Sequence, residues 1–109
     1  MAKTRIFPTI NPTFRATVGI PIPGGKPFDI EFVFKYRPKS ELIAWREALE
    51  LLPQAGFTAD HVMDMATEWD LVDEFNAENI AKILEASPGA GLSIFIRYNS
   101  ELQEAKAKN

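Results

Sequence analysis

Two stretches near the start of the chain alternate between apolar and polar residues, which is the period of a half-buried β-strand. In residues 14–20, FRATVGI, the apolar residues fall on one face and the polar residues on the other. In residues 28–36, FDIEFVFKY, the apolar face consists of Phe28, Ile30, Phe32, Phe34 and Tyr36. The segment between them, PIPGGKP, holds three prolines and two glycines, so it cannot continue a strand. The pattern predicts an antiparallel β-hairpin over residues 14–36.

Beyond the hairpin the apolar residues recur at helical spacing, and about four helices are predicted. The first covers residues 40–52, SELIAWREALELL, and Pro53 ends it. The second begins after Thr58, whose hydroxyl is suited to capping a helix N-terminus. Its apolar stripe is predicted to consist of Val62, Met65, Ala66 and Trp69. Both tryptophans of the chain lie on apolar helix faces in this prediction, so we expect them to pack in the core.

The third predicted helix is capped by Asn76, and the fourth begins at Ser87-Pro88 and runs to about Lys106. The apolar residues of the fourth helix cover roughly 200° of its circumference, which is wider than the stripe that a surface helix usually buries. They are Leu92, Ile94, Phe95, Ile96, Tyr98, Leu102 and Ala105. This helix is therefore expected either to be central to the core or to meet a partner with one side.

Together these elements predict an α+β fold, in which an N-terminal antiparallel β-hairpin is followed by about four α-helices. The length of 109 residues favours one domain. Residues 1–13 contain two prolines and no periodic pattern, so we predict a flexible lead-in there. Residues 14–109 are predicted to form the domain, with its helical part over 38–106.

The charges are unevenly distributed along the chain. Before Ser40 there are seven basic and two acidic residues, whereas residues 47–81 contain nine acidic residues and no lysine or arginine. A solvated mixed surface is the simpler interpretation, and complementary docking, either head to tail between copies or onto a charged partner, is the alternative. The formal net charge of −3 disfavours binding to nucleic acid. No apolar run is long enough to span a membrane or to form a signal peptide.

The sequence offers few residues for catalysis. It has no cysteine, which excludes a disulfide, a thiol nucleophile and a cysteine-ligated metal. The one histidine, His61, could share a helix face with Asp64 and Glu68, but an exposed acidic face is the preferred interpretation. The glycine pair at Gly24 lacks the spacing of a phosphate-binding loop. We therefore predict a protein that is not an enzyme and that uses no cofactor or metal.

The order of these features resembles that of bacteriophage tail assembly chaperones, which occur in long-tailed phages and in prophages. The resemblance spans nearly the whole chain, and it is carried by the ordered set of segments rather than by any single motif. The segments are TFRATV (13–18), IPIPGGKP (20–27), EFVFKY (31–36), EWD (68–70), FNAEN (75–79) and SPGA (87–90).

The resemblance implies a protein that binds the tape measure protein and presents it to the tail tube protein, in the cytoplasm of the bacterial host. Such a chaperone is absent from the finished virion and has no catalytic residues. The resemblance also allows self-association, as does an exposed sheet edge. The alternative is a bacterial α+β adaptor or regulatory module that binds one protein partner.

Two apolar surfaces are the candidate interfaces with a partner or a sister subunit, because a chaperone for exposed helices needs an apolar receptor surface. One is the aromatic face of the second strand, and the other is the wide face of the last helix. The candidate residues are Phe28, Ile30, Phe32, Phe34 and Tyr36 on the strand, and Leu92, Phe95, Ile96, Tyr98 and Leu102 on the helix.

Overall fold

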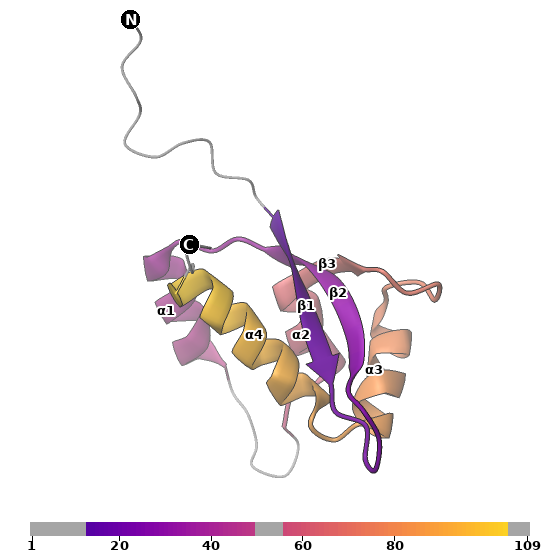
Figure 1. Cartoon of the computed structure of the whole chain (residues 1–109). Coiled ribbons are helices and arrows are strands. Elements are labelled where there is room, and N and C mark those ends of the chain that lie inside the picture. The colour runs from indigo at the N-terminus through magenta and orange to yellow at the C-terminus, as the bar shows by residue number, and fades with distance from the viewer. Residues whose placement is uncertain (1–12, 50–55, 105–109) are drawn as a thin grey trace, which may run out of the picture.

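The computed structural model describes residues 13–49 and 56–104, which form three strands and four helices (Figure 1). The predicted α+β class, with its N-terminal hairpin and its helices, is confirmed. The predicted lead-in falls outside the described residues, apart from Thr13. The elements in chain order are β1 (Thr13–Ile20), β2 (Phe28–Lys35), α1 (Lys39–Ala48), α2 (Ala59–Met65), β3 (Ala66–Trp69), α3 (Ala77–Ala86) and α4 (Ala90–Glu104).

The two strands of the hairpin pair antiparallel, as predicted. β1 and β2 pair along their whole length, from Thr13 opposite Lys35 to Ile20 opposite Phe28. At the tip, the amide of Gly25 donates to the carbonyl oxygen of Ile22 at 2.9 Å. The intervening Pro23-Gly24 pair suits a type II turn, because Gly24 has a φ of 78° that residues with a side chain rarely adopt.

β3 is a correction to the sequence prediction, which placed Ala66 and Trp69 on a helix. They lie instead on a strand that pairs antiparallel with β2, giving the sheet order β1-β2-β3. Trp69 lies opposite Phe32 and Ala66 lies opposite Phe34, while a bulge leaves Thr67 without an opposite residue. Two residues three apart in a regular strand would face opposite sides. The bulge brings Ala66 and Trp69 to the same, core side of the sheet. Their separation of three residues in the sequence therefore looked like one face of a helix.

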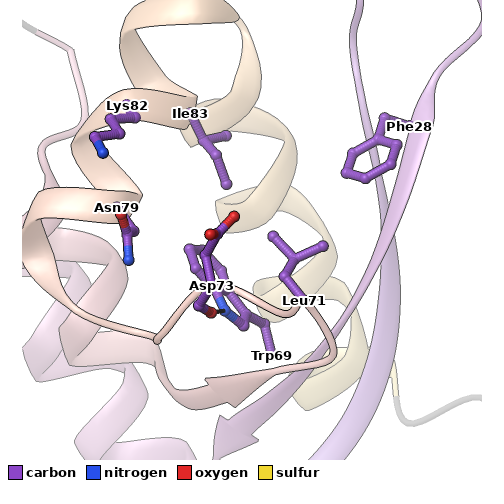
Figure 2. A pocket seen from close by; sticks show the side chains of 7 residues that line it. All are labelled: Phe28, Trp69, Leu71, Asp73, Asn79, Lys82 and Ile83. Carbon is purple, nitrogen blue, oxygen red and sulfur yellow. Dashed lines mark hydrogen bonds between the residues drawn. The ribbon is translucent and has the colours of Figure 1, made fainter.

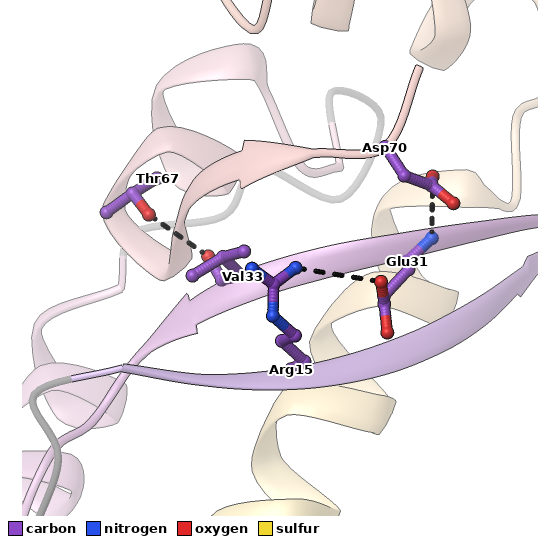
Figure 3. Close-up of polar contacts among 5 residues, drawn as sticks. All are labelled: Arg15, Glu31, Val33, Thr67 and Asp70. Atoms are coloured by element: carbon purple, nitrogen blue, oxygen red, sulfur yellow. Dashed lines mark hydrogen bonds and ion pairs between the residues drawn. The ribbon is translucent and has the colours of Figure 1, made fainter.

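The helices cover the aromatic face of the sheet. α4 packs against β1, α2 packs against β2 and β3, and α3 packs mainly on α2 (Figure 1). The core between these layers consists largely of Val18, Ile20, Ile30, Phe32, Phe34, Val62, Met65, Ile80, Ile94 and Tyr98, all almost fully buried. The other face of the sheet is more polar, and there the guanidinium of Arg15 lies 3.7 Å from the carboxylate of Glu31 (Figure 3).

Two helix starts follow from local hydrogen bonds. Thr58 and Asn76 cap α2 and α3, as predicted, because their side-chain oxygens accept bonds from the backbone amides of His61 and Asn79. α4 begins at Ala90 rather than at Pro88. Ser87 is buried at the end of α3, and its hydroxyl donates to the carbonyl oxygen of Pro21 in the hairpin loop.

The first helix is shorter than predicted, because α1 ends at Ala48 and Leu49 has an extended backbone. The rest of the predicted span, residues 50–52, lies outside the described residues. Both tryptophans pack against the core, as expected, although each keeps part of its surface exposed. Trp45 on α1 contacts the rings of Phe95 and Tyr98, and Trp69 contacts the ring of Phe32 from β3.

Candidate partner-binding surfaces

Four of the ten candidate interface residues belong to the core of the chain itself. Ile30, Phe32, Phe34 and Tyr98 are each fully buried. The alternation of β2 correctly placed the first three on one face, but α2 and α4 cover that face within the same molecule. These four side chains cannot reach a partner while the domain is folded, so they are removed from the candidate surface.

The other six candidates reach the surface to different extents. Phe95 and Leu102 are half-buried and pack against the core. The remaining four, whose side chains are between 37% and 54% exposed, are Phe28, Tyr36, Leu92 and Ile96.

Leu92 and Ile96 form what we call the α4 ridge. They lie one turn apart on α4 and are 53% and 54% exposed, whereas Ile94 and Tyr98 on the same helix are buried. A shallow depression of about 310 Å³ separates Ile96 from β1, and it is lined by small or polar residues such as Thr17 and Ser100. Because β1 is the outer strand of the sheet, the ridge adjoins a sheet edge.

A second surface, which we call the basic groove, lies between the β2–α1 connection, α1 and the end of α4. Its volume is about 750 Å³. The apolar side chains that line it include Tyr36, Leu42, Ile43 and Leu102. Within the described part of the chain, the charged side chains that line it are basic, namely Arg37, Lys39 and Arg46.

Two arginines of the basic groove are held in place by neutral acceptors. Arg37 Nη1 donates to the carbonyl oxygen of Asp64 at 3.0 Å and to the hydroxyl of Tyr98 at 2.7 Å. Its guanidinium also lies over the ring of Trp45, 4.6 Å from the ring centroid, in a cation–π contact. Arg46 Nη1 donates to Asn99 Oδ1 at 3.1 Å.

A third hollow, of about 290 Å³, lies where the start of β2 faces α3 and the segment after β3 (Figure 2). Phe28, Leu71 and Ile83 line it together with Trp69. The indole of Trp69 donates to the carbonyl oxygen of Asp73 at 2.7 Å, so its polar atom is already satisfied. The polar side chains that line this hollow are Asp73, Asn79 and Lys82, and the side-chain amide of Asn79 donates to the carbonyl oxygen of Glu74 at 2.8 Å.

His61 has a local structural role. Its Nδ1 accepts a hydrogen bond from the amide of Thr58 at 2.9 Å, which completes a reciprocal capping box at the start of α2. Glu68 lies on β3, so the helix face that would have joined His61, Asp64 and Glu68 does not exist. Within residues 13–49 and 56–104, no group of three or more histidine, aspartate or glutamate side chains is arranged to hold a metal ion.

Sequence reasoning identified Tyr36 and Leu102 but missed most of the basic groove. The sequence held one indication of the groove. Ile43 is apolar but lies outside the buried stripe of α1, and it is 37% exposed. Arg46 follows three residues later, and so lies near Ile43 on the surface of the helix. The groove itself depends on how α4 approaches α1, which helical periodicity does not specify.

Of the three comparisons with known proteins, one gives a match. None of the helices in the described part of the chain is long and apolar enough to cross a membrane. No curated protein and no solved structure matches the chain. The family model described as phage tail assembly chaperone matches residues 1–109, which is the whole chain. The chain therefore belongs to the phage tail assembly chaperone family.

Proposed function

We propose that this chaperone binds the tape measure protein before tail assembly and presents it to the tail tube protein, in the cytoplasm of the bacterial host. The protein then leaves the assembly and is not part of the finished virion. Membership of the tail assembly chaperone family supports the general role. That role requires binding and release only, so it needs no catalytic residue and no cofactor.

The α4 ridge is the observation that carries this proposal. Exposed leucine and isoleucine side chains one turn apart can pack into the grooves of a second helix. Because about half of each residue is already buried, covering the rest would contribute about half of the 1.5–3 kcal/mol that full burial of such a side chain gives. The ridge is also held rigidly, because the opposite side of α4 packs in the core through Ile94 and Tyr98. A tape measure helix with an exposed apolar stripe is a suitable occupant.

Co-purification tests the proposal. The chain is co-expressed with the tape measure protein of the same phage or prophage, and the amount retained is measured for Leu92→Asp, Ile96→Asp and the double variant. A charge on the ridge must be desolvated on binding, so we expect each single variant to retain much less and the double variant to retain none.

The matched control is Val72→Asp, since Val72 is a fully exposed apolar residue in the segment after β3, away from α4. It should retain as much tape measure protein as the unmodified chain. Far-ultraviolet circular dichroism and thermal unfolding establish that all variants are folded. Full retention by the folded double variant would rule out the α4 ridge as the holding surface.

A further inference from the structure

The basic groove combines an apolar lining with charge of one sign. Leu42 is buried at its base, while Tyr36 and Ile43 are each 37% exposed. The volume of about 750 Å³ lies in the range of sites that enclose a ligand and can accept several apolar side chains. Among the described residues, the lining contains three basic side chains and no carboxylate.

The positive charges of this groove are not compensated within the described part of the chain. The ion pairs found there are Arg15–Glu31 on the sheet and Arg97–Glu101 on α4, both outside the groove lining. Arg37 and Arg46 donate instead to a backbone carbonyl, a phenol and an amide. These bonds fix the positions of the guanidinium groups but leave their charge available to a partner.

We infer that the basic groove binds an amphipathic helix whose apolar stripe is bordered by carboxylates. The inference rests on the proposed function, in which the chain holds helices of another protein. α1 and the end of α4 flank the groove, so a helix laid between them would insert its apolar side chains against Leu42, Ile43 and Leu102. Glutamates or aspartates beside that stripe would then meet Lys39 and Arg46.

Two synthetic peptides test this charge preference. Both carry the same leucine stripe at helical spacing, bordered by glutamates in one peptide and by lysines in the other. Fluorescence anisotropy measures the binding of each labelled peptide to the full chain. We expect the glutamate peptide to bind about tenfold more tightly, which corresponds to about 1.4 kcal/mol. The double variant Lys39→Glu/Arg46→Glu should reverse the preference.

The matched control is Lys26→Glu/Lys82→Glu, which makes the same change in net charge at two exposed positions outside the groove. It should keep the preference for the glutamate peptide. Equal binding of both peptides to the unmodified chain, or binding of neither, would overturn the inference. So would a reversed preference in the control variant, because the preference would then reflect net charge alone.

Light scattering tests the other possible occupant of the groove, which is a second copy of this chain. If Lys39→Glu/Arg46→Glu lowers the molar mass in solution and leaves the peptide preference unchanged, the groove is a self-association site and the inference is wrong. The proposed function is judged separately, by retention of the tape measure protein on the unmodified chain. If the unmodified chain retains no tape measure protein, the proposed function is wrong. The peptide titration tests only the inference about the basic groove.

Discussion

The buried hydroxyl of Tyr98 accepts a hydrogen bond from Arg37 Nη1 at 2.7 Å, which ties α4 to the connection between β2 and α1. The same hydroxyl donates to the carbonyl oxygen of Lys35 at 2.8 Å, at the end of β2. Arg37 Nη1 also donates to the carbonyl oxygen of Asp64 on α2. One phenol therefore joins the sheet to α4 and helps to position one wall of the basic groove.

Tyr98→Phe should destabilise the fold. Removing the hydroxyl leaves the carbonyl of Lys35 and the guanidinium of Arg37 each without one partner, in a region that the core largely excludes from water. We expect a loss of about 1–3 kcal/mol in the free energy of unfolding, measured by urea denaturation. Tyr36→Phe is the matched control, because Tyr36 is the other tyrosine of the chain and is 37% exposed. Tyr36→Phe should change the free energy of unfolding by no more than about 0.5 kcal/mol.

The stability of the fold should fall at high pH through Tyr98. Burial raises the pKa of its phenol above the ordinary value of 10.0, and the hydrogen bond and charge of Arg37 oppose that rise. The folded state therefore favours the protonated phenol. Its contribution to stability is fully present below pH 10.0, and it is lost as the pH rises through the pKa of the folded state.

The Tyr36→Phe variant makes this titration measurable, because Tyr98 is then the only tyrosine. Its phenolate absorbance should rise at a pH above 10.0, alongside the decrease in unfolding free energy. In Tyr98→Phe the free energy of unfolding should decrease less over the same pH range, because only the other titrating groups remain. Identical pH profiles for the two variants would contradict a raised pKa at Tyr98.

Gly91→Ala should weaken the packing of α4. A Cβ at Gly91 would lie 2.5 Å from the Cβ of Phe57, an atom fixed to the backbone that cannot move away by rotating the side chain. We expect a loss of about 1–3 kcal/mol, measured by chemical denaturation. Gly89→Ala is the control, since a Cβ there would meet the ring of Pro21 at 3.4 Å and needs only a small adjustment. Equal effects of the two substitutions would contradict this explanation.

Asp70→Ala should loosen the attachment of β3 to the sheet. Asp70 Oδ1 accepts a hydrogen bond from the amide of Glu31 at 3.0 Å (Figure 3), and its own amide donates to the carbonyl oxygen of Glu31 at 3.1 Å. The alanine variant loses the side-chain bond, so we expect the free energy of unfolding to fall by about 0.5–1.5 kcal/mol. Hydrogen exchange at the amide of Glu31 should become faster.

Asp73→Ala is the control for this substitution. The contact of Asp73 with Trp69 uses its backbone carbonyl, which alanine retains. Stability and exchange at Glu31 should stay close to those of the unmodified chain. An equal loss in both aspartate variants would indicate an effect of net charge rather than of the hydrogen bond.

Local patterns in the sequence accounted for much of the fold. Alternation predicted β1, β2 and their antiparallel pairing, and the capping residues Thr58 and Asn76 marked the starts of α2 and α3. These features depend on residues close in sequence. β3 was missed because its bulge depends on pairing with β2, which lies more than 30 residues earlier in the chain.

The candidate surface was predicted less well, for a related reason. By itself the sequence determined which residues are apolar and which face of each element they share. Only the tertiary structure decided which of those faces the chain covers with its own helices. α2 and α4 bury Ile30, Phe32 and Phe34 but leave Phe28 and Tyr36 partly exposed at the two ends. Periodicity describes one helix or strand at a time. Burial depends on how far a second element extends over that face. The α4 ridge and the basic groove are two of the apolar surfaces that remained exposed once those layers had packed.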